Sequence, residues 1–512
     1  MRTPLLDGLK QYDEEQILRF HMPGHYGRML KEYEELGEKL FCFDVTEVPG
    51  LDDLAEPTGI LKESLDGIAE VYGAEQSFFL VNGSTSGIHV AIESLVPNGG
   101  TLLLARNSHK SILNIARRKN LELEFVYPVL DEVFGVDSHI ELEEVRQAVE
   151  SAGQRVDAAI LTYPNYYGRA YDIESIHRYL KEQGIPLIID SAHGASFVFS
   201  KELPCSAVQH SEVCIHSLHK TMPAFTQTSL LHIGSGLNEG QRERIRQNLR
   251  IDLSSSPSYL LMASAELAVA IMEDRGEAEL ERIYHAWQKA VTLLGEQKHI
   301  AVYQDEWHPH DFCKLFLKTP IDAEVLSERL RKDHRIQCEM TMGDMILFML
   351  GISHKDEEIE YLARSVIECV TRLIDEGKTI GQRGGSQRNL TFLPRVRRLS
   401  SKEIEQMEKS LEGEEGSSDG RDCLLSGACR DRSENIPKRD AAEIIVKGWI
   451  EAGEIIETVE VQDASGKILA EDIIPYPPGI PILMRYEILD TNSVNLLKYF
   501  KIDKIRCFSF KR

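Results

Sequence analysis

The stretch PLIIDSAHGA, residues 186–195, decides the fold class of this chain. Its apolar run ends at Asp190, and small residues follow. A short, continuously apolar run of this kind is typical of a strand buried on both faces. We therefore predict a mostly parallel sheet covered by helices, with Asp190 at the carboxyl end of one strand.

The surrounding sequence, from about Glu75 to Gly234, repeats this pattern. Apolar runs alternate with helix-periodic stretches, which is typical of the α/β fold class. The expected strands are SFFLV (77–81), TLLLA (101–105), LEFVYP (123–128), AAILTYP (158–164), PLIID (186–190), VCIHS (213–217) and SLLHIG (229–234). The expected helices are GIHVAIESLV (87–96), SHKSILNIARRK (108–119), IELEEVRQAVE (140–150) and SIHRYLKEQG (175–184). Ligands of such sheets bind at the carboxyl ends of the strands.

The rest of the chain divides where the pattern changes. A long helix is expected from Tyr259 to about Asp274, and new strand and helix patterns over 300–379 indicate a smaller α/β domain. Residues 409–437 are rich in Gly, Ser and charge, which indicates a linker or mobile loop. The predicted division is an N-terminal arm (1–50), a large domain (51–299), a small α/β domain (300–408), the linker (409–437) and a C-terminal domain (438–512).

Composition restricts the classes of function. The 512 residues include 58 Lys plus Arg against 82 Asp plus Glu, so a general nucleic-acid binder, which needs clustered cations, is not expected. The nine cysteines show no metal-ligand spacing, which favours reduced thiols in a cytoplasmic protein without a metal site. The N-terminus has no apolar core of a signal peptide. The most apolar helical stretch, 259–272, is too short to span a bilayer, so no membrane partner is expected.

The segment VNGSTSGIHVAI, residues 81–92, joins an expected strand to an expected helix through a Gly-rich turn. Gly permits the tight turn, and the N-terminus of the helix offers unpaired N–H groups to a phosphate. Ser84 and Thr85 can add hydroxyl donors. An ordinary capped turn accounts for this segment equally well when it is taken alone.

Two more polar clusters follow expected strands. Asp190 and His193 lie in IIDSAHGA, where a carboxylate can keep a heterocyclic nitrogen protonated, although an Asp that caps the next element is the alternative. Ser217, His219 and Lys220 lie in CIHSLHK. A lysine there can form a Schiff base if burial and neighbouring cations lower its pKa, although a lone lysine is usually a surface charge.

Together the three features match one cofactor. A phosphate cradle, an acid for a ring nitrogen and a Schiff-base lysine occur in that chain order, each at a strand end. Pyridoxal 5'-phosphate (PLP) needs those three partners. Lys220 follows Asp190 by 30 positions, the usual arrangement in aspartate-aminotransferase-like (fold type I) PLP enzymes, which this chain resembles.

Within fold type I, the chain resembles the Orn/Lys/Arg decarboxylase family in its shorter form, without an N-terminal wing domain. The matching motifs run in order through nearly the whole chain: FHMPGH (20–25), DVTEVPGLDDL (44–54), NGSTSG (82–87), RNSHKS (106–111), TYPNYYG (162–168), DSAHGA (190–195), SLHKTMPAFTQT (217–228), SSPSYLLMAS (255–264) and YPPGIP (476–481). The chain departs from the family's pattern at Tyr26, where Lys is frequent, and at Ala55, where His is frequent. It also has Arg485-Tyr486-Glu487 in place of a Pro-Gly-Glu turn.

The resemblance implies roles for individual residues. Lys220 would form the internal aldimine, and Asp190 would bind the pyridine nitrogen with His193 close to the ring. His109 would stack on the ring face. The phosphate would be surrounded by Ser84, Thr85, Ser217 and His219. The large domain, 51–299, would be the PLP-binding domain, and 438–512 a decarboxylase-type C-terminal domain.

The resemblance also implies an activity, the decarboxylation of a basic L-amino acid to carbon dioxide and a di- or polyamine precursor. Arginine is favoured as substrate, then lysine or ornithine. Glu487 would meet the distal cation of the substrate, and the alternative is an ordinary surface acid. A homodimer or higher homo-oligomer is expected. Two alternatives stay open: an aminotransferase or carbon–sulfur lyase on the same fold, or a PLP-binding scaffold that has lost catalysis and serves regulation.

Overall fold

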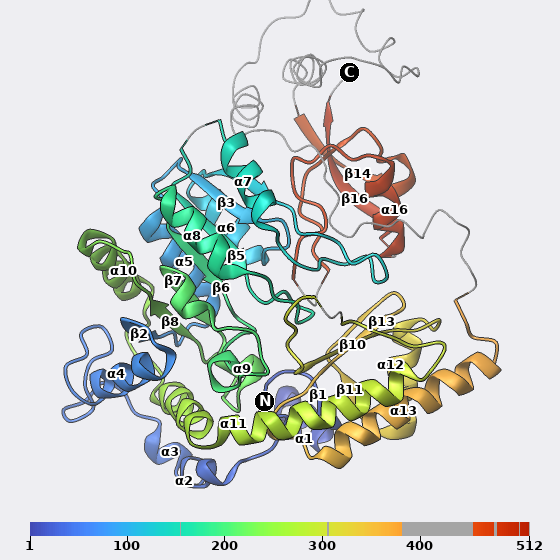
Figure 1. Ribbon diagram of the computed structural model, residues 1–512, viewed down its shortest axis with the longest axis horizontal. Helices are drawn as coiled ribbons and strands as arrows, with labels where there is room; N and C mark the ends of the chain where they lie inside the picture. The colour runs from blue at the N-terminus through green and yellow to red at the C-terminus, as the bar shows by residue number, and fades with distance from the viewer. Residues whose placement is uncertain (154, 305–306, 381–453, 476–478, 501, 511–512) are drawn as a thin grey trace, which may run out of the picture. The chain divides into compact units, whose positions relative to one another are not determined.

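The chain divides into two units in the computed structural model (Figure 1). One comprises residues 1–389 with 477–480, and the other residues 390–476 with 481–512. The structure describes residues 1–153, 155–304, 307–380, 454–475, 479–500 and 502–510.

A seven-stranded sheet is the centre of the first unit. Its strand order is β2-β8-β7-β6-β5-β3-β4, and only β8 runs antiparallel to its neighbours. The strands are β2 (Gln76–Phe79), β3 (Thr101–Ala105), β4 (Glu122–Val126), β5 (Ala158–Thr162), β6 (Leu187–Asp190), β7 (Val213–His216) and β8 (Leu230–Ile233). The predicted mostly parallel sheet is confirmed.

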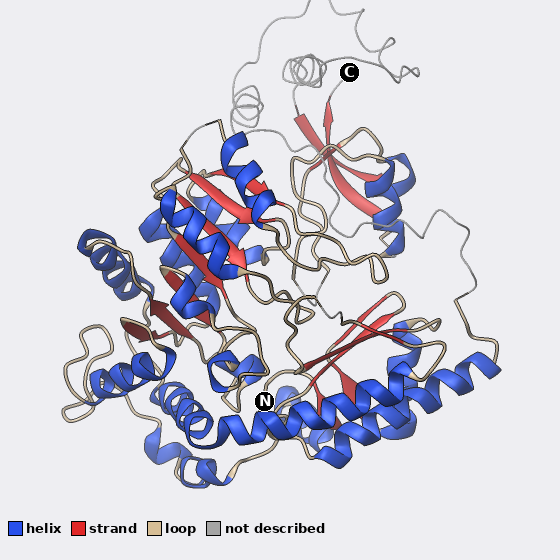
Figure 2. Cartoon of the chain, in the orientation of Figure 1, coloured by secondary structure: helices blue, strands red, loops and turns tan. Residues whose placement is uncertain are grey.

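Helices connect and cover these strands (Figure 2). Every residue of β3, β6, β7 and β8 is buried, which explains why their sequences are mostly apolar. The helices around the sheet are α4 (Ile60–Tyr72), α5 (Ser84–Leu95), α6 (Lys110–Arg118), α7 (Leu142–Ser151), α8 (Ile173–Glu182), α9 (Leu218–Thr221) and α10 (Glu239–Asp252). Each expected strand and helix of this region is present, with ends shifted by a few residues.

The direction of the strands brings several strand ends to one edge of the sheet. Strands β5, β6 and β7 are parallel, so their carboxyl ends lie together. Because β2 and β7 are both antiparallel to β8, which lies between them, β2 also ends at this edge. The polar motifs of the sequence directly follow these strand ends.

Helix α11 (Tyr259–Gly295) continues well past its expected end at about Asp274. Its second half keeps the helical spacing of buried residues, namely Leu280, Ile283, Ala286, Ala290 and Leu294. Gly276 does not interrupt the helix, and it allows close packing, because an added Cβ would lie 3.3 Å from Cβ of Phe199. In the described part of the chain, no helix is long and apolar enough to cross a membrane.

A smaller antiparallel sheet, in the order β12-β13-β10-β9, also belongs to the first unit. The N-terminal strand β1 pairs in parallel with β11 beside it. The strands are β1 (Leu18–Phe20), β9 (Ala301–Val302), β10 (Lys314–Lys318), β11 (Ile336–Cys338), β12 (Met340–Met342) and β13 (Met345–Met349). The helices are α1 (Pro4–Glu14), α2 (Glu34–Glu38) and α3 (Leu40–Phe43) near the N-terminus, then α12 (Ala323–His334) and α13 (Asp356–Asp375).

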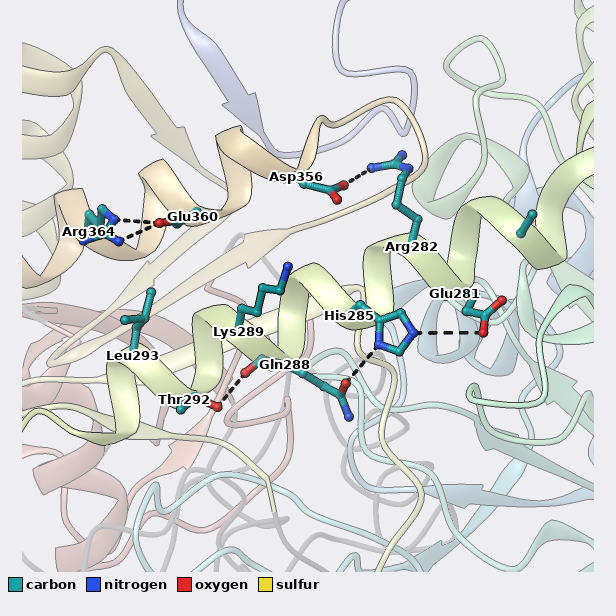
Figure 3. A pocket seen from close by; sticks show the side chains of 11 residues that line it. Glu281, Arg282, His285, Gln288, Lys289, Thr292, Leu293, Asp356, Glu360 and Arg364 are labelled. Atoms are coloured by element: carbon teal, nitrogen blue, oxygen red, sulfur yellow. Dashed lines mark hydrogen bonds and ion pairs between the residues drawn. The ribbon is translucent and has the colours of Figure 1, made fainter.

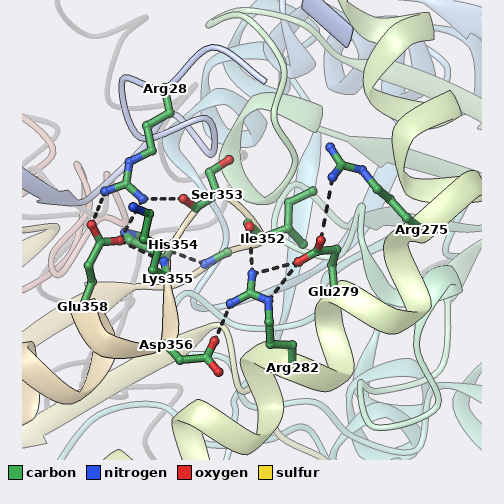
Figure 4. Close-up of polar contacts among 11 residues, drawn as sticks. Arg28, Arg275, Glu279, Arg282, Ile352, Ser353, His354, Lys355, Asp356 and Glu358 are labelled. Atoms are coloured by element: carbon green, nitrogen blue, oxygen red, sulfur yellow. Dashed lines mark hydrogen bonds and ion pairs between the residues drawn. The ribbon is translucent and has the colours of Figure 1, made fainter. Parts of the chain in front are cut away.

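Ion pairs tie the N-terminal segment and α11 to the start of α13 (Figure 4). Arg282 of α11 donates to Asp356 at 2.6 Å and to the carbonyl of Ile352 at 3.0 Å. Arg28 donates to Glu358 at 2.8 Å. These side chains are partly exposed, so each pair contributes about 1 kcal/mol or less. Together these contacts fix the position of the loop that connects β13 to α13.

The second unit contains an antiparallel sheet in the order β14-β16-β15. Its elements are β14 (Glu454–Glu460), β15 (Ile468–Leu469), α16 (Thr491–Tyr499) and β16 (Lys504–Phe510). The ring of Tyr486 stacks on Phe508 with centroids 5.4 Å apart. The predicted linker, 409–437, lies outside the described residues.

Candidate active site

Lys220 lies in the short helix α9, directly after β7. Its amine nitrogen is 3.2 Å from Nε2 of His193. Desolvation lowers the pKa of Lys220 and the Lys314 cation lowers it further, while the carboxylates of Asp190 and Glu339 act in the opposite direction. A lysine with a lowered pKa is more often the uncharged nucleophile that a covalent link to a carbonyl requires.

Asp190 is the last residue of β6 and is buried. Its Oδ1 accepts a hydrogen bond from the backbone amide of Ala192 at 3.2 Å. Burial raises the pKa of Asp190, while a positive charge on Lys220 would favour the carboxylate form. Thr162 lies beside Asp190 in the parallel register, and its buried hydroxyl has no hydrogen-bond partner among the described residues. This end of the sheet therefore has unused hydrogen-bonding capacity for a polar group.

His193 is buried between two lysine amines. Its Nε2 is 3.2 Å from Nζ of Lys220, and its Nδ1 is 2.9 Å from Nζ of Lys314. Burial holds its pKa well below the usual value, and a positive charge on either lysine lowers it further, so the imidazole is uncharged at neutral pH. The ring of Tyr166 packs edge-on against it, with centroids 5.2 Å apart.

The Gly-rich turn after β2 forms an uncapped start of α5. Gly83 has a φ of 81°, a conformation that favours glycine, and it provides no side chain to cap the helix. Ser84 and Thr85 begin the helix, and Ser217 Oγ donates to Ser84 Oγ at 2.8 Å. The first-turn N–H groups of a 12-residue helix thus lie beside the start of α9. Such a cluster of donors suits a phosphate.

Two further histidines belong to this region. His219 Nδ1 is 3.0 Å from the carbonyl oxygen of Thr228, a contact in which the ring N–H donates. Nδ1 of His109, the N-cap of α6, accepts from the backbone amide of Ser111 at 3.3 Å, which leaves its proton on Nε2. Burial lowers the pKa of each imidazole to about 4, and a positive charge on Lys220 would contribute in both cases. Both rings are therefore neutral and fixed in orientation, and a neutral ring can stack on an aromatic cofactor.

The structure thus places eight of the predicted residues at the carboxyl ends of four strands of one sheet, namely β2, β3, β6 and β7. Glu487 lies in the second unit, where it is buried and its Oε2 accepts from the backbone amide of Met484 at 2.8 Å. Its role toward a substrate stays a prediction.

Sequence reasoning missed three residues of the site, all in or near the small sheet. Lys314 begins β10 and is 1% exposed. Asp311 is buried, and its carboxylate favours the charged form of Lys314. Glu339 accepts from the hydroxyl of Tyr166 at 2.8 Å. The available signal was a lysine inside the apolar strand FCKLFLK, since lysine is rarely buried without a partner.

Tyr26, one of the departures from the family's pattern, is buried beside this cluster. Its ring packs on His354 with centroids 4.0 Å apart. Its hydroxyl has no hydrogen-bond partner among the described residues. Burial raises the pKa of Tyr26, so the hydroxyl stays protonated.

Family models match two parts of the chain. Residues 3–308 match the major domain of Orn/Lys/Arg decarboxylases, and residues 439–506 match the C-terminal domain of the same family. The chain belongs to the Orn/Lys/Arg decarboxylase family. It is therefore an amino acid decarboxylase with an α/β fold of the fold type I class.

Individual relatives agree with this assignment. The chain is 29% identical to the uncharacterized protein YaaO of Bacillus subtilis (strain 168), over 97% of this chain and 94% of that protein. It is 25% identical to the arginine decarboxylase of the same strain, over 97% of this chain and 93% of that enzyme. The solved structure of the Escherichia coli constitutive lysine decarboxylase has a TM-score of 0.63 at 22% identity, covering 98% of this chain and 78% of that chain.

A charged groove of about 980 Å³ between α11 and α13 contains none of the predicted site residues (Figure 3). Its acids lie near its own bases: Arg364 donates to Glu360 at 2.6 Å, and His285 is 4.0 Å from Glu281. Alternating charges of this kind are typical of solvated helix faces. The groove is not a second candidate for catalysis.

Proposed function

We propose that this chain decarboxylates a basic L-amino acid with PLP, and that it prefers arginine to lysine or ornithine. The observation that carries the proposal is the pairing of Lys220 with Asp190 at the ends of adjacent parallel strands. One provides an amine whose pKa is lowered by burial, and the other a buried carboxylate with spare acceptor capacity. PLP enzymes need both.

The chemistry of the donor set fits PLP. The uncapped start of α5, with Ser84, Thr85, Ser217 and His219, suits the phosphate. The unpartnered hydroxyl of Thr162 and the carboxylate of Asp190 suit polar atoms of the ring. PLP, when bound, would accept the electron pair released as the α-carboxylate leaves as carbon dioxide.

The residues of the chain perform the remaining tasks. Asp190 would keep a proton on the cofactor's ring nitrogen, because a buried carboxylate stabilises a neighbouring cation. The amine of Lys220 would hold the cofactor, and the same group, when free, would return a proton to the substrate's Cα. His109 would stack on the cofactor ring, and its lowered pKa keeps the imidazole neutral. His193 orients the amine of Lys220.

The preference for arginine rests on chain architecture. The Bacillus subtilis arginine decarboxylase is matched over 93% of its length, whereas the E. coli lysine decarboxylase structure is matched over 78% of its chain. Glu487 is proposed to bind the distal cation of the substrate. Its carboxylate is already fixed by the Met484 amide, and a fixed acid distinguishes a cationic from a neutral side chain.

We also propose that the chain acts as a homodimer or larger homo-oligomer in the cytoplasm. Large apolar side chains are exposed in the N-terminal segment, namely Leu5, Leu6, Leu9, Leu40, Phe41, Phe43, Val48 and Ile60. Exposed apolar side chains gathered in one segment are typical of an interaction surface. The seven cysteines in the described residues are all free thiols, as expected in a reducing compartment.

A screen of arginine, lysine and ornithine with purified protein and PLP tests the proposal. Carbon dioxide and the matching amine should appear fastest from arginine. Release of an oxo acid without carbon dioxide would indicate an aminotransferase instead. PLP binding without turnover of any of the three would favour a non-catalytic scaffold.

A further inference from the structure

Lys220, His193 and Lys314 form a buried array in which one imidazole bridges two amines. The imidazole Nε2 is 3.2 Å from the amine of Lys220, and Nδ1 is 2.9 Å from the amine of Lys314. Lys220 and His193 follow strands of the large sheet, whereas Lys314 begins β10 of the small sheet. The array therefore joins two sheets through two hydrogen bonds.

Lys314 is built into this position by a glycine. Gly168 has a φ of 99°, and an added Cβ would lie 2.9 Å from Cγ of Lys314. The backbone amide of Asp311 also donates to the carbonyl of Gly168 at 2.8 Å, which fixes the loop before Lys314. A side chain larger than hydrogen at position 168 would displace Lys314 from His193.

The hydrogen-bond donors and acceptors of the array limit which of its groups can be charged. An uncharged imidazole has one N–H donor and one acceptor nitrogen, and a lysine ammonium can only donate. If both lysines were ammonium ions, one would face the N–H of His193 with no acceptor. Both contacts are satisfied only when one lysine is an uncharged amine that accepts from the ring.

The neighbouring carboxylates and the lengths of the two contacts indicate which lysine keeps its proton. Two carboxylates favour the charged form of Lys314. One belongs to Asp311, before β10, and the other to Glu339, before β12. Lys220 is also near two carboxylates, Asp190 and Glu339, and repulsion between the two lysines disfavours a charge on each of them equally. The other ionisable groups near Lys220 are the neutral imidazoles of His109 and His219. The contact of Lys314 with the imidazole is also the shorter one, 2.9 Å against 3.2 Å for Lys220, as expected for a charged donor. We therefore assign the ammonium ion to Lys314 and the uncharged amine to Lys220.

We propose, on the basis of the function proposed above, that Lys314 is a positioning residue which holds the His193 proton on Nε2 and thereby keeps Lys220 as an uncharged amine. Lys314 donates to Nδ1, and Nε2–H donates to Nζ of Lys220. An ordinary lysine with a pKa of about 10.4 is uncharged in only about one molecule in 2,500 at pH 7. The array would thus supply the amine in the form that bonds to an aldehyde.

The test measures the protonation of Lys220 without cofactor or substrate. The full chain, freed of PLP, is treated with formaldehyde and cyanoborohydride across pH 6–10, and methylation of Lys220 is read by peptide mass spectrometry. Lys314→Met should raise the midpoint of the Lys220 profile by about one pH unit or more, because a nearby cation and the fixed tautomer are both lost. Lys314→Gln keeps a donor to Nδ1, so its shift should be smaller.

Matched variants separate this effect from general damage. Lys318→Met removes a cation from the same strand, where Lys318 is 3.8 Å from Asp344, and should leave the midpoint unchanged. Asp190→Asn should move the midpoint down, because the Asp190 carboxylate favours the charged form of Lys220. If neither Lys314 variant folds, His193→Leu carries the test and should also raise the midpoint.

An unchanged or lowered midpoint in the folded variants would overturn the inference, even if the enzyme decarboxylates arginine. Conversely, a raised midpoint in a protein that turns over no basic amino acid would support the array while refuting the proposed function. The two failures are therefore distinguishable.

Discussion

Replacing Asp190 with Asn tests the charge at the end of β6. The side chain keeps its size, and its amide oxygen can still accept from the Ala192 amide, which lies 3.2 Å from Oδ1. What disappears is the negative charge of a buried residue that is 4% exposed. A buried electrostatic contribution of this kind is worth about 3 kcal/mol. At 1.36 kcal/mol per factor of ten, the rate should fall about a hundredfold or more.

The assay is carbon dioxide release from arginine at saturating PLP, together with the absorbance of the bound cofactor. PLP should remain linked to Lys220, because Asp190 is not the group that bonds to it. Asp172→Asn is the matched control: Asp172 is an exposed cap of α8 that accepts from the Ser175 amide at 3.0 Å, and Asn caps a helix equally well. A near-normal rate for Asp190→Asn would remove Asp190 from the mechanism. Loss of PLP binding along with turnover would show that Asp190 mainly supports the site's structure.

Three further substitutions test separate parts of the structure. Lys220→Ala should abolish turnover and the borohydride-reducible link to PLP, and peptide mapping that finds the link on another lysine would refute its assignment. Glu487→Gln should lower catalytic efficiency on arginine about ten- to a hundredfold, since a charge-assisted hydrogen bond is worth roughly 1.5–3 kcal/mol. Glu471→Gln is the matched control: Glu471 also accepts from a backbone amide, and its replacement should not lower catalytic efficiency. If Glu487→Gln lost equal efficiency on arginine and on a neutral analogue, charge recognition by Glu487 would be contradicted. Burial raises the pKa of Asp137 from 3.8 to about 6, so the folded state binds its proton more tightly and the associated stability is lost as the pH rises through 6. Between pH 5 and 8, the free energy of unfolding measured by urea titration should therefore fall about 1.4 kcal/mol more for the wild type than for Asp137→Asn, and parallel pH profiles would contradict this.

The large sheet could be predicted because its strands are buried on both faces. Such strands appear in the sequence as continuous apolar runs, and each run ends where a polar motif begins. Asp190 and the segment containing Lys220 follow adjacent strands for this reason. The length of α11 could not be predicted as easily, because Gly276 lowers the helical propensity in the middle of the helix. Its compensating contact with Phe199 is visible only in three dimensions.

Lys314 could not be identified from its strand alone. Residues 314 and 318 are both lysines of FCKLFLK, and alternation places them on the same face of a strand. In the structure Lys314 is buried, whereas Lys318 is half-buried and donates to the carbonyl of Val133. Lys314 packs closely against Gly168, which comes from a loop of the large sheet far away in sequence. No local pattern contains that information.

The array also explains why a single domain of this fold would be insufficient for the proposed chemistry. The large sheet alone supplies Lys220, Asp190 and His193, but a neutral His193 could then carry its proton on either nitrogen. With the proton on Nδ1, Nε2 would accept from Lys220 and so stabilise its ammonium form. The ammonium group of Lys314 donates to Nδ1 at 2.9 Å, so the imidazole proton must lie on Nε2. The small sheet thus contributes to the chemistry by setting the protonation state of Lys220. The reactivity of the Lys220 amine, which belongs to the large sheet, therefore depends on how the small sheet packs against the large one.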